Sequence, residues 1–98
     1  MAPSCALDAD GLRRQRERYR RMGAGATVIE RSPRRLVVEV AEGGADVVPE
    51  VIAVESECCP FFDLAWDAGA RRFSIAVSES QHEPALDAIE FALGVGAK

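Results

Sequence analysis

The segment FFDLAWDAGARRFSIAVS, residues 61–78, decides the fold. Each half alternates apolar and polar side chains, as in a strand with one buried face. The apolar positions that fall on one side are Phe62, Leu64, Trp66, Phe73, Ile75 and Val77. Asp67-Ala-Gly-Ala70 between the halves is typical of a turn. The segment therefore predicts an antiparallel hairpin that packs one face into a core.

A second hairpin is predicted upstream, over residues 26–31 and 35–41. Both runs are rich in β-branched residues, and Pro33 fixes the backbone of the turn between them. Alternation in the second run places Leu36, Val38 and Val40 on one side, while Val37 and Glu39 point the other way. This hairpin too is expected to present one apolar face.

Three further segments have apolar residues at helical spacing: residues 8–22, 47–58 and 80–93. The first has only a thin stripe of Leu12, Tyr19 and Met22, which predicts a helix on the surface of the body. The second is expected to end near Cys58, because Pro60 disfavours helical geometry at Cys59.

Capping residues are predicted at all three helices, and Asp8 or Asp10 can cap the first. Asp46 precedes the second helix and is a suitable N-cap. Ser80 and Glu83 have the spacing of a capping box at the start of the third helix.

The elements follow the order αββαββα, which predicts the fold class. We expect an α+β fold with a four-stranded antiparallel sheet, built from two hairpins and covered by helices on one face. The length of 98 residues suits a single domain, residues 1–98, in which residues 1–7 form a loose N-terminal tail.

Composition narrows the range of partners. The chain is 48% hydrophobic and has a net charge of −4, which argues against general nucleic-acid binding. Six arginines lie within residues 1–22. This segment is expected to be a solvated helix that packs against the acidic remainder of the chain, and contact with nucleic acid or an acidic partner is the alternative. We see neither a membrane-spanning stretch nor a signal peptide, and expect a cytoplasmic protein without membrane contact.

Cys58 and Cys59 are the main chemical clue. Neighbouring cysteines rarely bond to each other, and an odd total of three fits poorly with a disulfide framework, so we expect free thiols. Two adjacent thiols suit a soft ion such as Zn(II), Cu(I), Hg(II) or As(III). Glu55 is the first candidate to assist, but a closed site needs more donors: Glu57, His82, Cys5 or a second chain.

The surroundings of this pair argue against thiol catalysis. A helix C-terminus and the acidic side chains of Glu55 and Glu57 should raise the thiol pKa, whereas an activated cysteine needs a lowered one. His82 has no nucleophile tied to it by sequence and is expected at the surface. We therefore predict no enzymatic activity; plain burial of the cysteines and redox sensing remain alternatives to metal binding.

The stretch VESECCPFF, residues 54–62, resembles a family of small, largely uncharacterised bacterial proteins. Their hallmark is a Glu-x-x-Cys-Cys-Pro-Phe segment followed by alternating apolar residues. The matching positions here are Glu55, Cys58, Cys59, Pro60 and Phe61. Similar domains accompany metal-responsive regulators of the MerR and ArsR type, so the resemblance implies a role near heavy-metal handling.

Two functions follow as expectations. The first is a small non-enzymatic domain that binds a soft metal or metalloid ion through Cys58 and Cys59 with help from Glu55. The second is a structural or protein-interaction domain in which the cysteines are only packed. A homodimer over the uncovered face of the sheet, near Val37 and Ala65, is one partner that the second reading allows.

Overall fold

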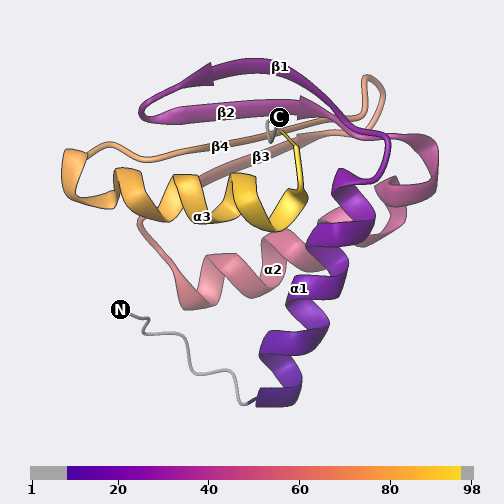
Figure 1. The fold of residues 1–98 in the computed structure, drawn as a ribbon, viewed down its shortest axis with the longest axis horizontal. Helices are drawn as coiled ribbons and strands as arrows, with labels where there is room; N and C mark the ends of the chain where they lie inside the picture. The colour runs from indigo at the N-terminus through magenta and orange to yellow at the C-terminus, as the bar shows by residue number, and fades with distance from the viewer. Residues whose placement is uncertain (1–8, 96–98) are drawn as a thin grey trace.

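The computed structural model describes residues 9–95 and contains three α-helices and a four-stranded antiparallel sheet (Figure 1). The predicted order αββαββα is confirmed. The elements are α1 (Ala9–Gly23), β1 (Thr27–Ser32), β2 (Arg35–Glu39), the 3-10 helix η1 (Glu42–Val47), α2 (Val48–Cys58), β3 (Asp63–Asp67), β4 (Arg72–Ala76), the 3-10 helix η2 (Ser80–His82) and α3 (Glu83–Leu93). The tail predicted for residues 1–7 lies outside the described residues.

The sheet has the order β1-β2-β4-β3, so the two hairpins join through β2 and β4. Antiparallel pairing places Leu36 beside Ile75 and Val38 beside Phe73 across this junction. Trp66 of β3 is in turn the partner of Phe73. The apolar faces predicted separately for each hairpin therefore form one continuous surface.

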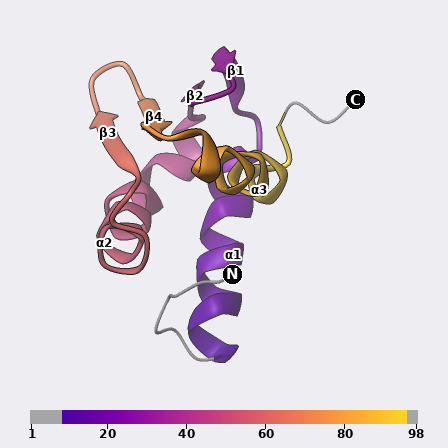
Figure 2. The same cartoon turned by 90° about the vertical axis from the view of Figure 1, so that its left-hand side faces the viewer.

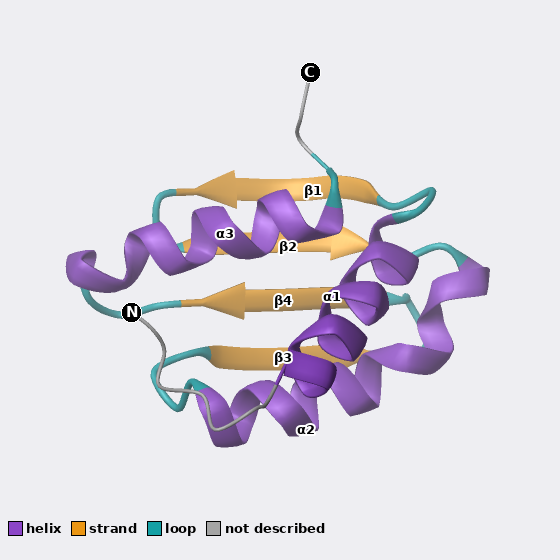
Figure 3. Cartoon of the chain, turned by 60° about the horizontal axis from the view of Figure 1, so that its bottom comes forward, coloured by secondary structure: helices purple, strands orange, loops and turns teal. Residues whose placement is uncertain are grey.

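All three helices cover this apolar surface and leave the other face of the sheet open (Figures 2 and 3). In Figure 3, α3 lies in front of β1 and β2, while α2 lies near β3. The core lies between the sheet and the helices, and both contribute to it. Its residues include Tyr19, Met22, Leu36, Val38, Val40, Val48, Val51, Phe73, Ile75, Leu86, Ile89 and Leu93. Among residues 9–95, no helix has the length and apolarity needed to cross a bilayer.

The helix α1 is anchored at its C-terminal end and extends away from the sheet at the other (Figures 1 and 2). Tyr19 and Met22 are buried near the anchored end, whereas Leu12 is 47% exposed. Leu12 belongs to the same predicted apolar stripe, but it is not buried with the other two residues. Leu12 has the helical spacing of the stripe, but it is exposed because the N-terminal part of α1 projects beyond the sheet and the other helices.

The side-chain caps predicted for α2 and α3 are not formed. Of the two candidate caps for α1, Asp10 lies inside the helix and Asp8 lies outside the described residues. The chain turns through η1 before α2, whose N-cap is Val47 without a side-chain hydrogen bond. The Asp46 carboxylate instead accepts hydrogen bonds from Arg21. Before α3, η2 takes the place of a capping box, and Glu83 accepts from Arg34. Both helices carry a proline in their first turn, which removes one backbone donor that a cap would satisfy.

Candidate functional site

The adjacent cysteines lie at the end of α2, as predicted. The helix ends at Cys58, and the backbone N–H of Cys59 donates to the Glu55 carbonyl at 2.7 Å. Pro60 follows directly and prevents another helical turn.

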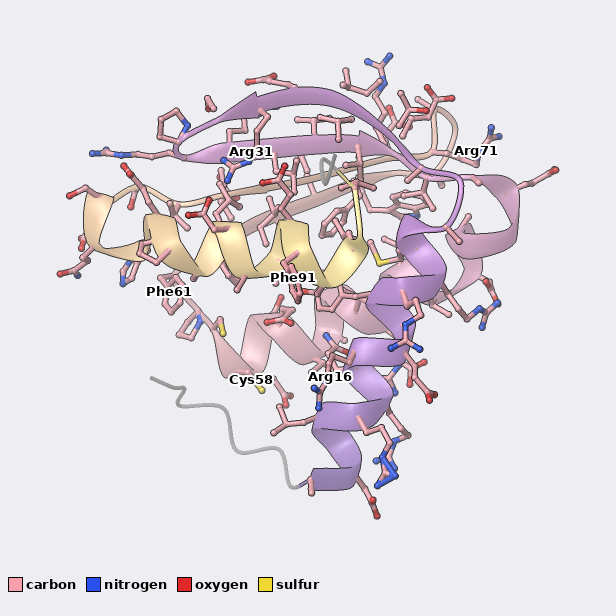
Figure 4. All side chains as sticks on the ribbon, viewed as in Figure 1. Arg16, Arg31, Cys58, Phe61, Arg71 and Phe91 are labelled. Atoms are coloured by element: carbon pink, nitrogen blue, oxygen red, sulfur yellow. The ribbon has the colours of Figure 1, made fainter. Side chains whose placement is uncertain are left out.

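Only one of the two thiols is free. Cys58 (Figure 4) is disulfide-bonded, whereas Cys59 is a free cysteine with partial exposure. The expectation of free thiols is wrong for Cys58. An odd number of cysteines leaves at least one unpaired, but it does not prevent a bridge between residues that folding brings together.

Glu55 is buried, with 8% of its surface exposed, between α2 and α1. Its Oε2 atom accepts hydrogen bonds from the Tyr19 hydroxyl at 2.7 Å and from the Gln15 amide at 3.2 Å. The charge of this carboxylate also acts on the thiol of Cys59, whose backbone N–H donates to the Glu55 carbonyl. A buried carboxylate is tolerated when several donors surround it, so Glu55 holds α1 and α2 together.

The same contacts change how Cys59 and Tyr19 titrate. Burial, followed by the charge of Glu55 and the hydrogen bond to it, raises the pKa of Cys59 from 9.0 to about 11. Burial and Glu55 also raise the pKa of Tyr19 well above its ordinary value. The predicted direction for the thiol is thus confirmed for Cys59, with burial as the largest cause. Because the thiolate is the reactive form, Cys59 is a poor nucleophile at neutral pH.

The described residues do not form a metal centre. Among residues 9–95, no three His, Cys, Asp or Glu side chains are grouped closely enough to hold an ion. Of the three predicted ligands, the structure brings Cys59 into contact with Glu55, while Cys58 is engaged in its disulfide. His82 is not the free surface histidine expected, because it is half-buried and stacks on Phe61 with ring centroids 4.0 Å apart.

A groove between α1 and α3 is the main surface feature that sequence reasoning missed. It consists of two adjoining hollows of about 500 and 380 Å³, which share Arg16 and Ala92. Phe91 lines the first and is 86% exposed, while Leu12 lines the second. Figure 4 shows Phe91 on α3 and Arg16 on α1 near the place where the helices converge. We call this surface the α1–α3 groove; its lining residues are Leu12, Gln15, Arg16, Tyr19, Arg20, Glu55, Ala88, Phe91, Ala92, Leu93 and Gly94.

Phe91 could have been singled out from the sequence. It lies outside the buried stripe of α3, which Leu86, Ile89 and Leu93 form. A large aromatic residue off the buried stripe of an amphipathic helix indicates a binding surface where it forms part of a larger apolar patch. The sequence does not show that the Phe91 side chain borders a concave surface, because that surface forms only when α1 packs against α3.

The arginines of α1 fall into two groups. Three pair with acidic side chains, since Arg13 bonds to Asp10, Arg18 to Glu50 and Arg21 to Asp46. The last two pairs hold the helix against η1 and α2, as expected of a basic helix leaning on an acidic body. Among the described residues, Arg14, Arg16 and Arg20 make no ion pair, and the last two line the α1–α3 groove.

Comparison with known proteins gives no relative from which function could be transferred. No family model matches the chain, and neither a curated protein nor a solved structure is significantly similar to it. The family resemblance of residues 54–62 therefore stays a prediction.

Proposed function

We propose that this chain is a non-enzymatic domain that binds another protein through the α1–α3 groove. The observation that carries the proposal is Phe91, which is 86% exposed beside a concave surface. Ala88 and Ala92 on α3 and Leu12 on α1 extend the apolar surface around it.

Burial of this surface would be favourable. Covering a phenylalanine side chain contributes about 1.5–3 kcal/mol by its apolar area alone. Aromatic residues beside pockets are frequent anchors of protein interfaces. A single exposed apolar residue needs no explanation, but a largely exposed aromatic side chain next to an apolar hollow does.

The environment of the cysteines supports the same proposal. Burial and the charge of Glu55 raise the pKa of the Cys59 thiol to about 11, which disfavours the thiolate needed for catalysis or rapid oxidation. Glu55 in turn already accepts hydrogen bonds from Tyr19 and Gln15. These groups act as structural residues between α1 and α2 in this proposal.

A set of synthetic amphipathic helical peptides provides the test. Each peptide carries leucines at positions i, i+3, i+4 and i+7 and uncharged polar residues elsewhere, and binding is followed by fluorescence anisotropy. We expect binding to the wild-type chain and about tenfold weaker binding to Phe91→Ala, because the aromatic anchor is lost.

Ile29→Ala is the matched control. Ile29 is 42% exposed on β1 and does not line the groove, so its truncation should leave peptide binding unchanged. Absence of binding by the wild type, or equal loss in both variants, would contradict the proposed function.

Soft-ion binding is a second candidate. It is favoured by the contact between Cys59 and Glu55 and by the position of Cys58 next to them. Reduction of the Cys58 disulfide would have to come first. A bound cation would then displace the thiol proton that the free protein retains, since metals deprotonate their thiol ligands.

Native mass spectrometry of the fully reduced protein tests this candidate. Titration with Zn(II), Cu(I), Hg(II) and As(III) should give one retained ion per chain, and the Cys58→Ser/Cys59→Ser variant should retain none. Equal retention by the wild type and the variant would exclude binding through these thiols. Glu55→Gln separates the role of the carboxylate, because it keeps the side-chain shape and removes the charge.

A further inference from the structure

The α1–α3 groove combines an apolar surface with uncompensated positive charge. Arg16 lines both hollows and Arg20 lines the larger one. Among the described residues, no Asp or Glu lines the hollow beside Phe91. The acid in the other hollow, Glu55, is buried and already surrounded by donors. The groove thus offers two guanidinium groups that have no acidic partner within residues 9–95.

We propose that the occupant of the groove is an acidic amphipathic helix of another protein. This inference rests on the proposed function and specifies its partner. Leucine-like side chains of the helix would cover Phe91, Ala92 and Leu12, while its carboxylates would lie opposite Arg16 and Arg20. Arginine suits this role because its planar guanidinium binds carboxylates with two parallel hydrogen bonds.

A helix fits the dimensions of the groove. The α1 residues that line it run from Leu12 to Arg20, a rise of about 12 Å at 1.5 Å per residue. Anchors at positions i and i+7 of a partner helix lie about 10.5 Å apart by the same rise. Two helices form the walls, which is the geometry of helix-in-groove recognition.

Charge argues against a second copy of this chain as the occupant. A two-fold dimer through the groove would place the same surface of both copies face to face. Arg16 and Arg20 of one copy would then share the interface with the same arginines of the other. Like charges brought together out of water disfavour such a contact, whereas an acidic partner neutralises them.

Three peptides that differ only in charge test the inference. All have the leucine ridge described above, and the flanking positions that would face α1 are Glu, Gln or Lys. We expect the Glu peptide to bind the wild-type protein about tenfold more tightly than the Lys peptide at low salt, with the Gln peptide between them. This difference should shrink as the salt concentration rises.

Two charge reversals locate the effect. Arg20→Glu should weaken binding of the Glu peptide about fivefold and strengthen that of the Lys peptide. Arg14→Glu changes the net charge equally, but Arg14 lies outside the groove lining, so it should have little effect. Equal responses of the two variants would show a nonspecific charge effect and overturn the inference.

The outcomes separate the two proposals. If all three peptides bind equally and Phe91→Ala weakens each of them, the acidic partner is wrong and the protein-binding groove stands. If none binds, the proposed function itself fails. A dimer of the wild type in sedimentation experiments that dissociates in Phe91→Ala would overturn the inference in favour of a second copy.

Discussion

Glu55 shows how far a single residue can be understood from sequence. Its closeness in sequence to Cys58 and Cys59 made it a candidate metal ligand. In the structure its carbonyl accepts a hydrogen bond from the Cys59 backbone N–H, and its charge raises the pKa of the Cys59 thiol. Its other partners, Tyr19 and Gln15, belong to α1 and are remote in sequence. No local pattern connects them, because the contact arises only when α1 packs against α2.

The shared environment of Cys59 and Tyr19 predicts a loss of stability at alkaline pH. Folding raises the pKa of both groups, so their contribution to stability is complete below their ordinary pKa values and is lost as pH rises through the folded ones. For Cys59 that window runs from about pH 9 to about pH 11. We expect the free energy of unfolding, measured by urea denaturation, to fall across this window.

Few other groups of the chain titrate between pH 9 and pH 11. The chain has one tyrosine and one lysine, and its arginines do not titrate in this range. Cys59→Ser and Tyr19→Phe should each reduce the pH dependence. A wild-type stability that stays constant from pH 8 to 11 would contradict the raised pKa values of Cys59 and Tyr19.

At the scale of elements, the meeting of α1 and α3 positions the groove. Gly23 is the last residue of α1, in keeping with the tendency of glycine to end helices. A Cβ atom at this position would lie 1.7 Å from the carbonyl oxygen of Leu93, at the end of α3. The sequence indicated where the helix ends but not that another backbone passes so close to it.

Gly23→Ala should therefore destabilise the fold, although alanine is the better helix former. The obstructing atom belongs to the backbone, so relief requires α1 and α3 to separate. We expect a loss of about 3 kcal/mol in the free energy of unfolding. Gly43→Ala is the control, because a Cβ there meets no atom within 4 Å; similar stability of the two variants would mean that the helices adjust without strain.

For the whole molecule, alternation along the strands predicted the two hairpins, the element order and the coverage of one sheet face. It did not predict the order β1-β2-β4-β3, because either strand of each hairpin presents an equally apolar face. The α1–α3 groove was missed for a related reason. Leu12 and Phe91 are exposed because of where α1 and α3 lie relative to the rest of the fold. The spacing of apolar residues within one helix does not predict that placement.

The strand order also has a consequence for how the chain assembles. Each hairpin closes between neighbouring segments, whereas the pairing of Arg35 with Ala76 joins distant ones. Closing the longer loop costs more chain entropy. The compensating contacts form only when Val38 and Phe73 pair across the junction. We therefore expect the hairpins to form early and the ladder between β2 and β4 to set the folding rate. Truncations at this ladder should slow folding, whereas changes in the α1–α3 groove should leave the folding rate unaltered.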